Sequence, residues 1–163
     1  MKPGLATLVF LLGLGAAAAP LRAQAQDGFR LGLSLGGTSL IGVVVERVSG
    51  RHALELTAGT WSFRDLSLSA AVKEYLGPSA MRPALGAGLW VELSRPAGAG
   101  RTGTAVVARF PVGFDWRAGP GHYVLFEMNV CRALWVRRTD PADETPPAER
   151  LIPLPGLSYR WDP

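Results

Sequence analysis

Three residues have side chains that often serve as nucleophiles or metal ligands: His52, His122 and Cys131. An acyl-transfer enzyme needs a serine or cysteine beside a histidine, and a zinc site needs several histidines or cysteines at short spacing. Neither histidine has such a neighbour in the sequence, and each precedes a predicted strand at a turn. A lone cysteine forms no internal disulfide. We therefore expect no catalytic residue, no metal site and no cofactor.

Charged side chains that recur at alternate positions among apolar residues are the other candidates for chemistry. The acids are Glu46, Glu55, Glu92, Asp115 and Glu127, and the bases are Arg30, Lys73, Arg109, Arg117 and Arg160. If these side chains face an enclosed interior, each needs an opposite partner, because burial of an unpaired charge is costly. The sequence thus predicts an interior ion-pair network, and a solvated outer face is the alternative.

Eight segments of alternating residues must position these charges. Successive side chains of a strand point to opposite faces, so an alternation of apolar with small or charged residues predicts strands with one apolar face. Glycine, proline, serine and aspartate separate the segments. The predicted strands cover residues 29–36, 41–46, 54–59, 66–73, 85–92, 105–113, 124–131 and 156–161. Residues 69–76 could instead form a short helix.

The composition of the other strand face indicates which way the apolar face points. A soluble barrel should carry many lysines, glutamates and threonines there, whereas this face is mostly glycine, serine and alanine. Small residues suit the narrow interior of eight strands, and the apolar face then points to lipid. Aromatic residues near the strand ends resemble the two girdles of a membrane barrel. Five of them have inward parity, which means that the strand alternation points them into the barrel, and only a bulge or a loop could turn them outward: Trp61, Phe63, Tyr75, Tyr123 and Trp135.

The first 25 residues have the three parts of a secretory signal peptide. A lysine opens the chain, residues 5–19 are apolar, and the A-x-A sequence at 23–25 predicts cleavage after Ala25. The apolar run is shorter than the roughly 20 residues of a spanning helix, and an uncleaved anchor is the alternative. We expect residues 26–163 to form one barrel domain. Although the pI is about 9.8, no basic cluster with interleaved aromatics is present, so we expect no nucleic-acid partner.

The strand pattern and the end segment with Leu157, Tyr159 and Trp161 resemble the small eight-stranded outer-membrane β-barrels of Gram-negative bacteria, of the OmpA/OmpX type. The resemblance implies an all-β fold, an eight-stranded antiparallel up-and-down transmembrane barrel with both ends in the periplasm. It also implies a monomer in the outer membrane, surrounded by lipopolysaccharide, whose last strand is an assembly signal for the barrel assembly machinery. Two features depart from the pattern: Asp162 and Pro163 follow the aromatic residue, and Pro153 and Pro155 should shorten the last strand.

Function is then expected at the outward loops. We expect Arg64, Arg101, Arg137 and Arg138 to contact lipid phosphates or a partner, and a solvated, proline-stiffened loop at 137–150 is the alternative. Because side chains fill an eight-stranded interior, we expect a plugged lumen and a structural or surface-interaction role. The first rival is a soluble periplasmic barrel that binds a small apolar ligand. The second is a lipid-modifying outer-membrane enzyme, although the serine, histidine and acid of the small-barrel lipid A deacylases have no counterpart here.

Overall fold

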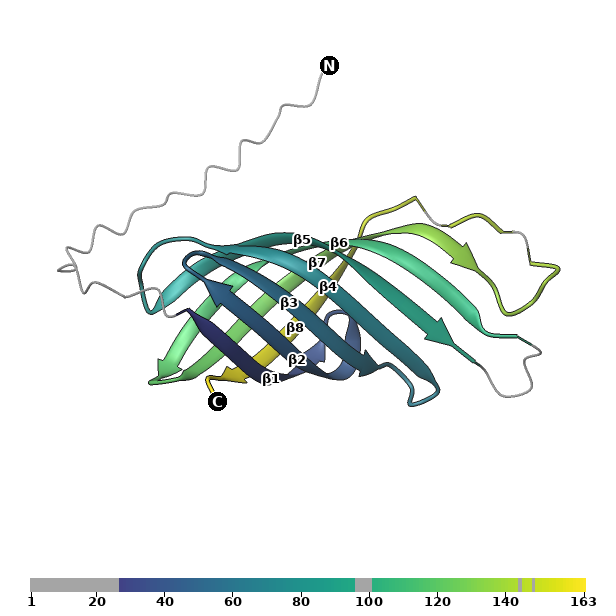
Figure 1. Cartoon of the computed structure of the whole chain (residues 1–163). Helices are drawn as coiled ribbons and strands as arrows, with labels where there is room; N and C mark the ends of the chain where they lie inside the picture. Colours follow the sequence, from purple (N-terminus) through teal and green to yellow (C-terminus); the bar gives the residue numbers. More distant parts are fainter. Residues whose placement is uncertain (1–26, 96–100, 144, 148) are drawn as a thin grey trace, which may run out of the picture.

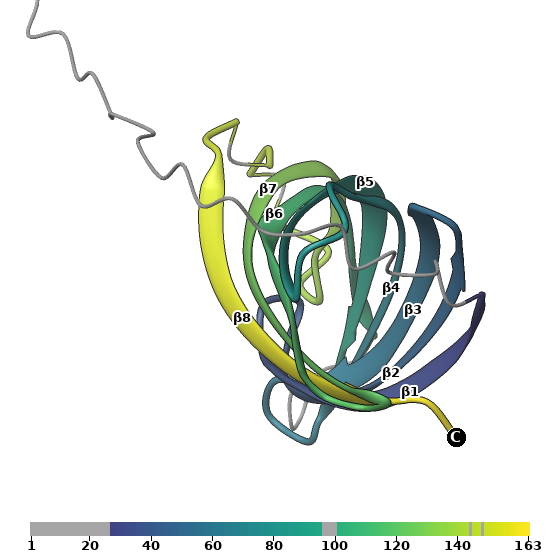
Figure 2. The same cartoon turned by 90° about the vertical axis from the view of Figure 1, so that its left-hand side faces the viewer.

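The computed structural model describes residues 27–95 and 101–163, except 144 and 148. Every strand pairs antiparallel with the next one, and β8 pairs with β1, so the sheet closes into a barrel (Figures 1 and 2). The strands are β1 (Gly28–Gly36), β2 (Ser39–Ser49), β3 (His52–Thr60), β4 (Asp65–Tyr75), β5 (Met81–Ser94), β6 (Gly103–Gly119), β7 (His122–Arg137) and β8 (Ile152–Trp161). The predicted eight-stranded antiparallel barrel is confirmed. The predicted signal peptide lies outside the described residues.

The alternative of a short helix over residues 69–76 is wrong. Strand β4 runs through this segment to Tyr75, and it pairs continuously with β5 from Asp65↔Ser94 to Tyr75↔Ala84. The alternation of Ser69, Ala71 and Lys73 with apolar residues therefore outweighs the helical preference of its alanines. Within the described part of the chain, no helix is long and apolar enough to cross a membrane.

The two ends of the barrel differ in their connections. At one end, the turn end, the strands are joined by Gly50 and Arg51, by residues 76–80, and by Pro120 and Gly121, and both the start of β1 and the end of β8 lie there (Figure 1). Gly50 and Gly121 have φ angles of 59° and 69°, the left-handed region that glycine tolerates in tight hairpins. At the other end, the loop end, the connections are residues 37–38, 61–64, 95–102 and 138–151.

Burial along each strand is the inverse of that in a soluble protein. In β3, Glu55 is 2% exposed while its neighbours Leu54 and Leu56 are 47% and 50% exposed. The same alternation of buried and exposed residues recurs in β2 and β4, where the inward positions include Glu46 and Lys73 and the outward ones Val45 and Val72. The barrel therefore has a polar interior and an apolar outer wall.

Inward-facing glycines bring neighbouring strands close together. A Cβ atom at Gly88 would collide with the carbonyl oxygen of Ala70 in β4, and one at Gly113 would collide with that of Phe126 in β7. The obstacle is the backbone of the adjacent strand rather than an interior side chain. These glycines therefore allow the wall to curve, in addition to the interior room that the sequence suggested.

Pro153 and Pro155 do not shorten the last strand, contrary to expectation. Both lie within β8, which pairs with β7 as far as Cys131↔Ile152. The Pro155 carbonyl accepts a hydrogen bond from Gly37 N at 2.8 Å, so the backbone N and O of Pro155 face β1. Pro153, two residues earlier in the strand, faces the same side. Because the β1–β8 pairing ends at Gly36↔Gly156, no ladder bond needs the missing N–H groups. The prolines instead protect a free edge.

The five aromatic residues of inward parity have different outcomes. Tyr75 and Tyr123 are 0% and 1% exposed and lie inside the barrel, so the expectation that they reach a girdle is wrong. A register shift at Val106/Val107 pairs Trp135 with outward-facing Val106, so here a bulge does re-aim the side chain. Phe63 is exposed in the β3–β4 connection, and Trp61 Nε1 donates to the Thr38 carbonyl.

Substitution of Gly113 should impair barrel closure. We expect Gly113→Val to lower the free energy of unfolding by about 3 kcal/mol, because overpacking against a backbone carbonyl cannot be relieved by a rotamer change. Urea titration of the chain refolded in detergent micelles, followed by tryptophan fluorescence, measures this change. Gly28→Val is the control, since a Cβ at Gly28 meets no atom within 4 Å. Equal stability of the two variants would contradict the role of Gly113.

Candidate functional site

The centre of the barrel interior is the Glu55 carboxylate. Strand β3 turns it inward, and three cations from three other strands surround it. One oxygen, Oε1, accepts from Arg109 Nη2 at 2.9 Å. The other, Oε2, accepts from Arg160 Nη2 at 2.5 Å and from Lys73 Nζ. One buried carboxylate cannot neutralise three cations, so further acids must complete the cluster.

Two more carboxylates supply that charge. Lys73 Nζ also donates to Glu127 Oε1 at 2.5 Å, and Arg160 Nη1 donates to Glu46 Oε1 at 2.5 Å. Arg109 completes its set by donating from Nη1 to Ser69 Oγ at 2.7 Å. Arg160 of β8 thus joins acids on β2 and β3, and this link ties the last strand to the start of the sheet.

A second group of charges lies toward the turn end. Arg30 contacts Glu46 at 3.2 Å, and Asp115 and Asp162 at 3.6 Å each. The Arg30 guanidinium also stacks 3.6 Å from the centre of the Tyr123 ring.

Arg82 and Tyr75 complete this second group. Arg82 pairs with Asp115 at 2.9 Å, and its guanidinium lies 4.1 Å from the centre of the Tyr75 ring. The Tyr75 hydroxyl donates to Glu46. The buried tyrosines therefore belong to the ion-pair network rather than to an interfacial girdle.

The interior ion pairs balance, and every strand contributes at least one charge. The bases are Arg30, Lys73, Arg82, Arg109 and Arg160, and the acids are Glu46, Glu55, Asp115, Glu127 and Asp162. Five positive charges therefore face five negative charges. This neutral ion-pair network fills the middle of the barrel.

Two members of the network were not predicted, and two predicted charges make no ion pair in the described part of the chain. Arg82 occupies an inward position, like Gly86 and Gly88, but it precedes the predicted strand at 85–92. Asp162 follows the last aromatic residue, yet its backbone N bonds Gly121 O at 2.9 Å and its carboxylate reaches Arg30. Glu92 is a wrong prediction, because it lies beside Ser67 toward the loop end, beyond the reach of the cations. Arg117 lies near the Tyr123 ring instead.

Neutral layers close the interior on both sides of the ion pairs. Toward the turn end, Val48, Ala53, Ala84 and Leu125 pack against Tyr75. Toward the loop end, the Thr38 carbonyl accepts from Trp61 Nε1 at 3.0 Å and from Ser67 Oγ. The pocket between Thr38 and the ion pairs measures about 20 Å³, little more than the space of one water molecule.

The four predicted outer-rim arginines do not act alike. Arg64 and Arg101 are exposed, and Arg137 extends along the outer wall with Nη2 3.4 Å from Thr104 Oγ1. Arg138 instead holds its own loop, since it donates to the Thr145 carbonyl and lies 3.3 Å from Asp143. Hydrogen bonds from Thr145, aided by Arg138, lower the pKa of Asp143. Arg138 therefore already has partners within its own loop.

The proposed assembly signal forms an aromatic surface on β8. Leu157 and Tyr159 are exposed on the outer wall, and the rings of Tyr159 and Trp161 lie 6.1 Å apart. The Tyr159 hydroxyl is 2.7 Å from His122 Nδ1, and the two rings stack. His122 is thus a partner of this surface at the turn end.

No protein-family model, no curated protein and no solved structure matches this chain. Its chemistry must therefore be inferred from its own geometry. No group of three or more histidine, cysteine or acidic side chains in the described residues could hold a metal ion. The interior charges are paired with one another, and the outer wall and the loops carry the exposed side chains.

Loss of the central carboxylate should destabilise the barrel strongly. We expect Glu55→Gln to lower the free energy of unfolding by about 3–5 kcal/mol, because Lys73, Arg109 and Arg160 would lose a shared counter-charge. Urea titration in detergent micelles measures the change. Glu92→Gln is the matched control and should shift stability by about 0.5 kcal/mol or less, since Glu92 makes no ion pair among the described residues. Equal effects of the two substitutions would contradict the central role of Glu55.

Proposed function

We propose that this chain is an exported outer-membrane β-barrel protein with a plugged lumen and a structural or surface-interaction role. The observation that carries the proposal is the inversion of burial: ten charges are neutralised inside, while leucine, valine and phenylalanine cover the outer wall. Exposed apolar patches above a few hundred Å² are rare on soluble monomers. A lipid environment removes that penalty because hydrocarbon tails are themselves apolar, and a closed sheet pairs the backbone of neighbouring strands without water.

Strand length and topology support a membrane location. A tilted strand needs about 9–11 residues to cross a bilayer, and the strands contain 9 to 17 residues. The predicted signal peptide supplies export, and the outward row Leu157, Tyr159 and Trp161 supplies the proposed signal for the barrel assembly machinery. In this proposal the turn end faces the periplasm and the loop end faces outward. Since closure pairs the strands within one chain, a monomer is sufficient.

The interior argues against the rival function of binding a small apolar ligand in a soluble barrel. Such a ligand needs an apolar cavity of some 300 Å³ or more, whereas the interior pocket described above is small and is lined mainly by polar groups. The proposed contacts are instead at the loop end, where Arg64, Arg101 and Arg137 would meet the phosphates of lipopolysaccharide or a partner. The lipid-modifying enzyme stays a rival without a supporting observation, because both histidines lie at the turn end.

Fractionation tests the location. We expect the expressed chain to be recovered from outer membranes only with detergent, to start at Gln26, and to migrate differently on gels before and after boiling. The closed barrel should keep its compact shape in detergent until it is heated. Recovery from the periplasmic fluid without detergent would overturn the membrane proposal. A chain that retains residues 1–25 would overturn the cleavage prediction alone.

Conductance tests the plugged lumen. We expect the purified protein, inserted into a planar lipid bilayer, to give no steady ion current, because salt-bridged side chains fill the cross-section at Glu55. A large single-channel porin, measured in the same bilayers, serves as the positive control. Steady current of defined amplitude from the wild-type chain would show that water and ions pass the network.

A further inference from the structure

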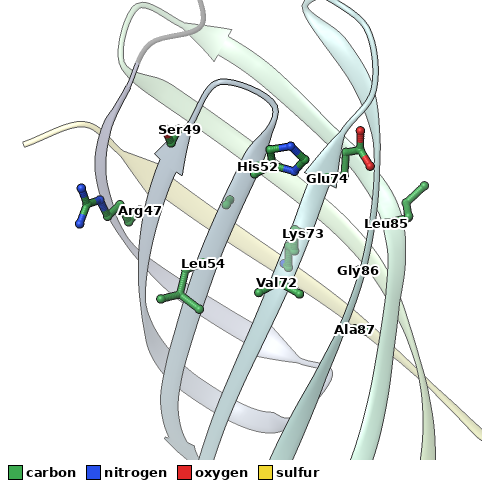
Figure 3. A pocket seen from close by; sticks show the side chains of 11 residues that line it. Arg47, Ser49, His52, Leu54, Val72, Lys73, Glu74, Leu85, Gly86 and Ala87 are labelled. Atoms are coloured by element: carbon green, nitrogen blue, oxygen red, sulfur yellow. The ribbon is translucent and has the colours of Figure 1, made fainter.

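A groove of about 660 Å³ lies on the outer wall across β2, β3, β4 and β5, near the turn end (Figure 3). Strand register explains its lining, since two rows of outward-facing partners cross these four strands. The row nearer the turns is Ser49, His52, Glu74 and Leu85, and the next row is Arg47, Leu54, Val72 and Ala87.

The apolar part of the groove results from one small residue among large ones. Ala87 lies on β5 between Leu85 and Leu89, which are 45% and 52% exposed. Its partner across the strand pair is Val72, and Leu54 follows on β3. A methyl group at position 87 leaves a depression walled by leucine and valine, which fits an extended hydrocarbon chain.

The polar part of the groove carries a net positive charge. Figure 3 shows Arg47 at one side of the groove and His52 and Glu74 toward its turn end. Glu74 is neutralised by Arg51 at 3.4 Å. Arg47 has no ion pair with any described residue, and its guanidinium lies 5.7 Å from the Phe29 ring. An unpaired arginine beside an apolar depression suits an anionic group that carries a long apolar tail.

We infer that this groove binds one glycerophospholipid from the membrane leaflet at the turn end. Arg47 contacts the phosphate at one side of the groove, while an acyl chain lies over Leu54, Val72 and Ala87. This inference rests on the proposed membrane location. An added peptide strand would need a free sheet edge, and β2 to β5 are paired on both sides. A second copy on this face would bury unpaired arginines, which is costly.

Native mass spectrometry of the mature, detergent-purified chain tests the inference. The probe is palmitoyl-oleoyl phosphatidylglycerol added to the micelles. We expect one lipid to bind wild type, and Ala87→Leu, which fills the depression, to weaken binding about tenfold. Arg47→Gln should weaken it to a similar extent, and Arg47→Lys should restore most of it. Ala108→Leu is the matched control, because Ala108 pairs with Leu89 on the same wall and does not line the groove.

The results distinguish three cases: the groove binds a lipid, it binds a second copy of this chain, or it binds neither. Equal binding by wild type and Ala87→Leu, or equal weakening by Ala108→Leu, would overturn the inference. A dimer lost in Ala87→Leu would assign the groove to a second copy and would also overturn it. If the variants stay heat-modifiable and membrane-bound in these cases, the proposed function survives. Recovery of the wild-type chain in soluble form without detergent would instead remove both proposals.

Discussion

A charged side chain that leaves water must meet an opposite charge, and this constraint organises the whole barrel. Glu55 satisfies it with cations from β4, β6 and β8, and Arg160 extends the ion-pair network to Glu46 on β2. Because partners lie on different strands, the network is complete only when all strands are in register. A slip of one residue would turn the charges toward the outer wall and leucines toward the interior. The interior charges are therefore neutralised only when the barrel is closed in the correct register.

The apolar outer wall and the polar interior both result from the alternation of apolar with small or charged residues along each strand. This alternation is the pattern behind the proposed membrane location. Glycines such as Gly88 and Gly113 let the wall curve tightly enough to close around the charges. Because ion pairs fill the interior, the proposed contacts with other molecules lie on the wall, the loops and the exposed face of β8.

Much of the fold was predictable because its signals are local. Period-two alternation places residues such as Leu54 and Glu55 on opposite faces without knowledge of any neighbour. Gly36 and Gly37 at the end of β1 and the long segment after Arg137 mark strand ends in the same way. Inward parity also selected most of the charges that form ion pairs, since an enclosed charge needs a partner wherever it comes from.

The sequence by itself thus determined the number of strands, their faces and the near-balance of interior charge. Only the tertiary structure decided which charges meet, because strand register and the depth of each residue in the barrel depend on pairing across the whole sheet. That is why Arg82 takes part and Glu92 does not, although both have inward parity. Asp162 and Trp135 were equally unpredictable from local pattern. Closure of the barrel brings Asp162 to Arg30, and a bulge in the β6–β7 pairing turns Trp135 outward. Local alternation decides the direction of a side chain, and closure decides its neighbours.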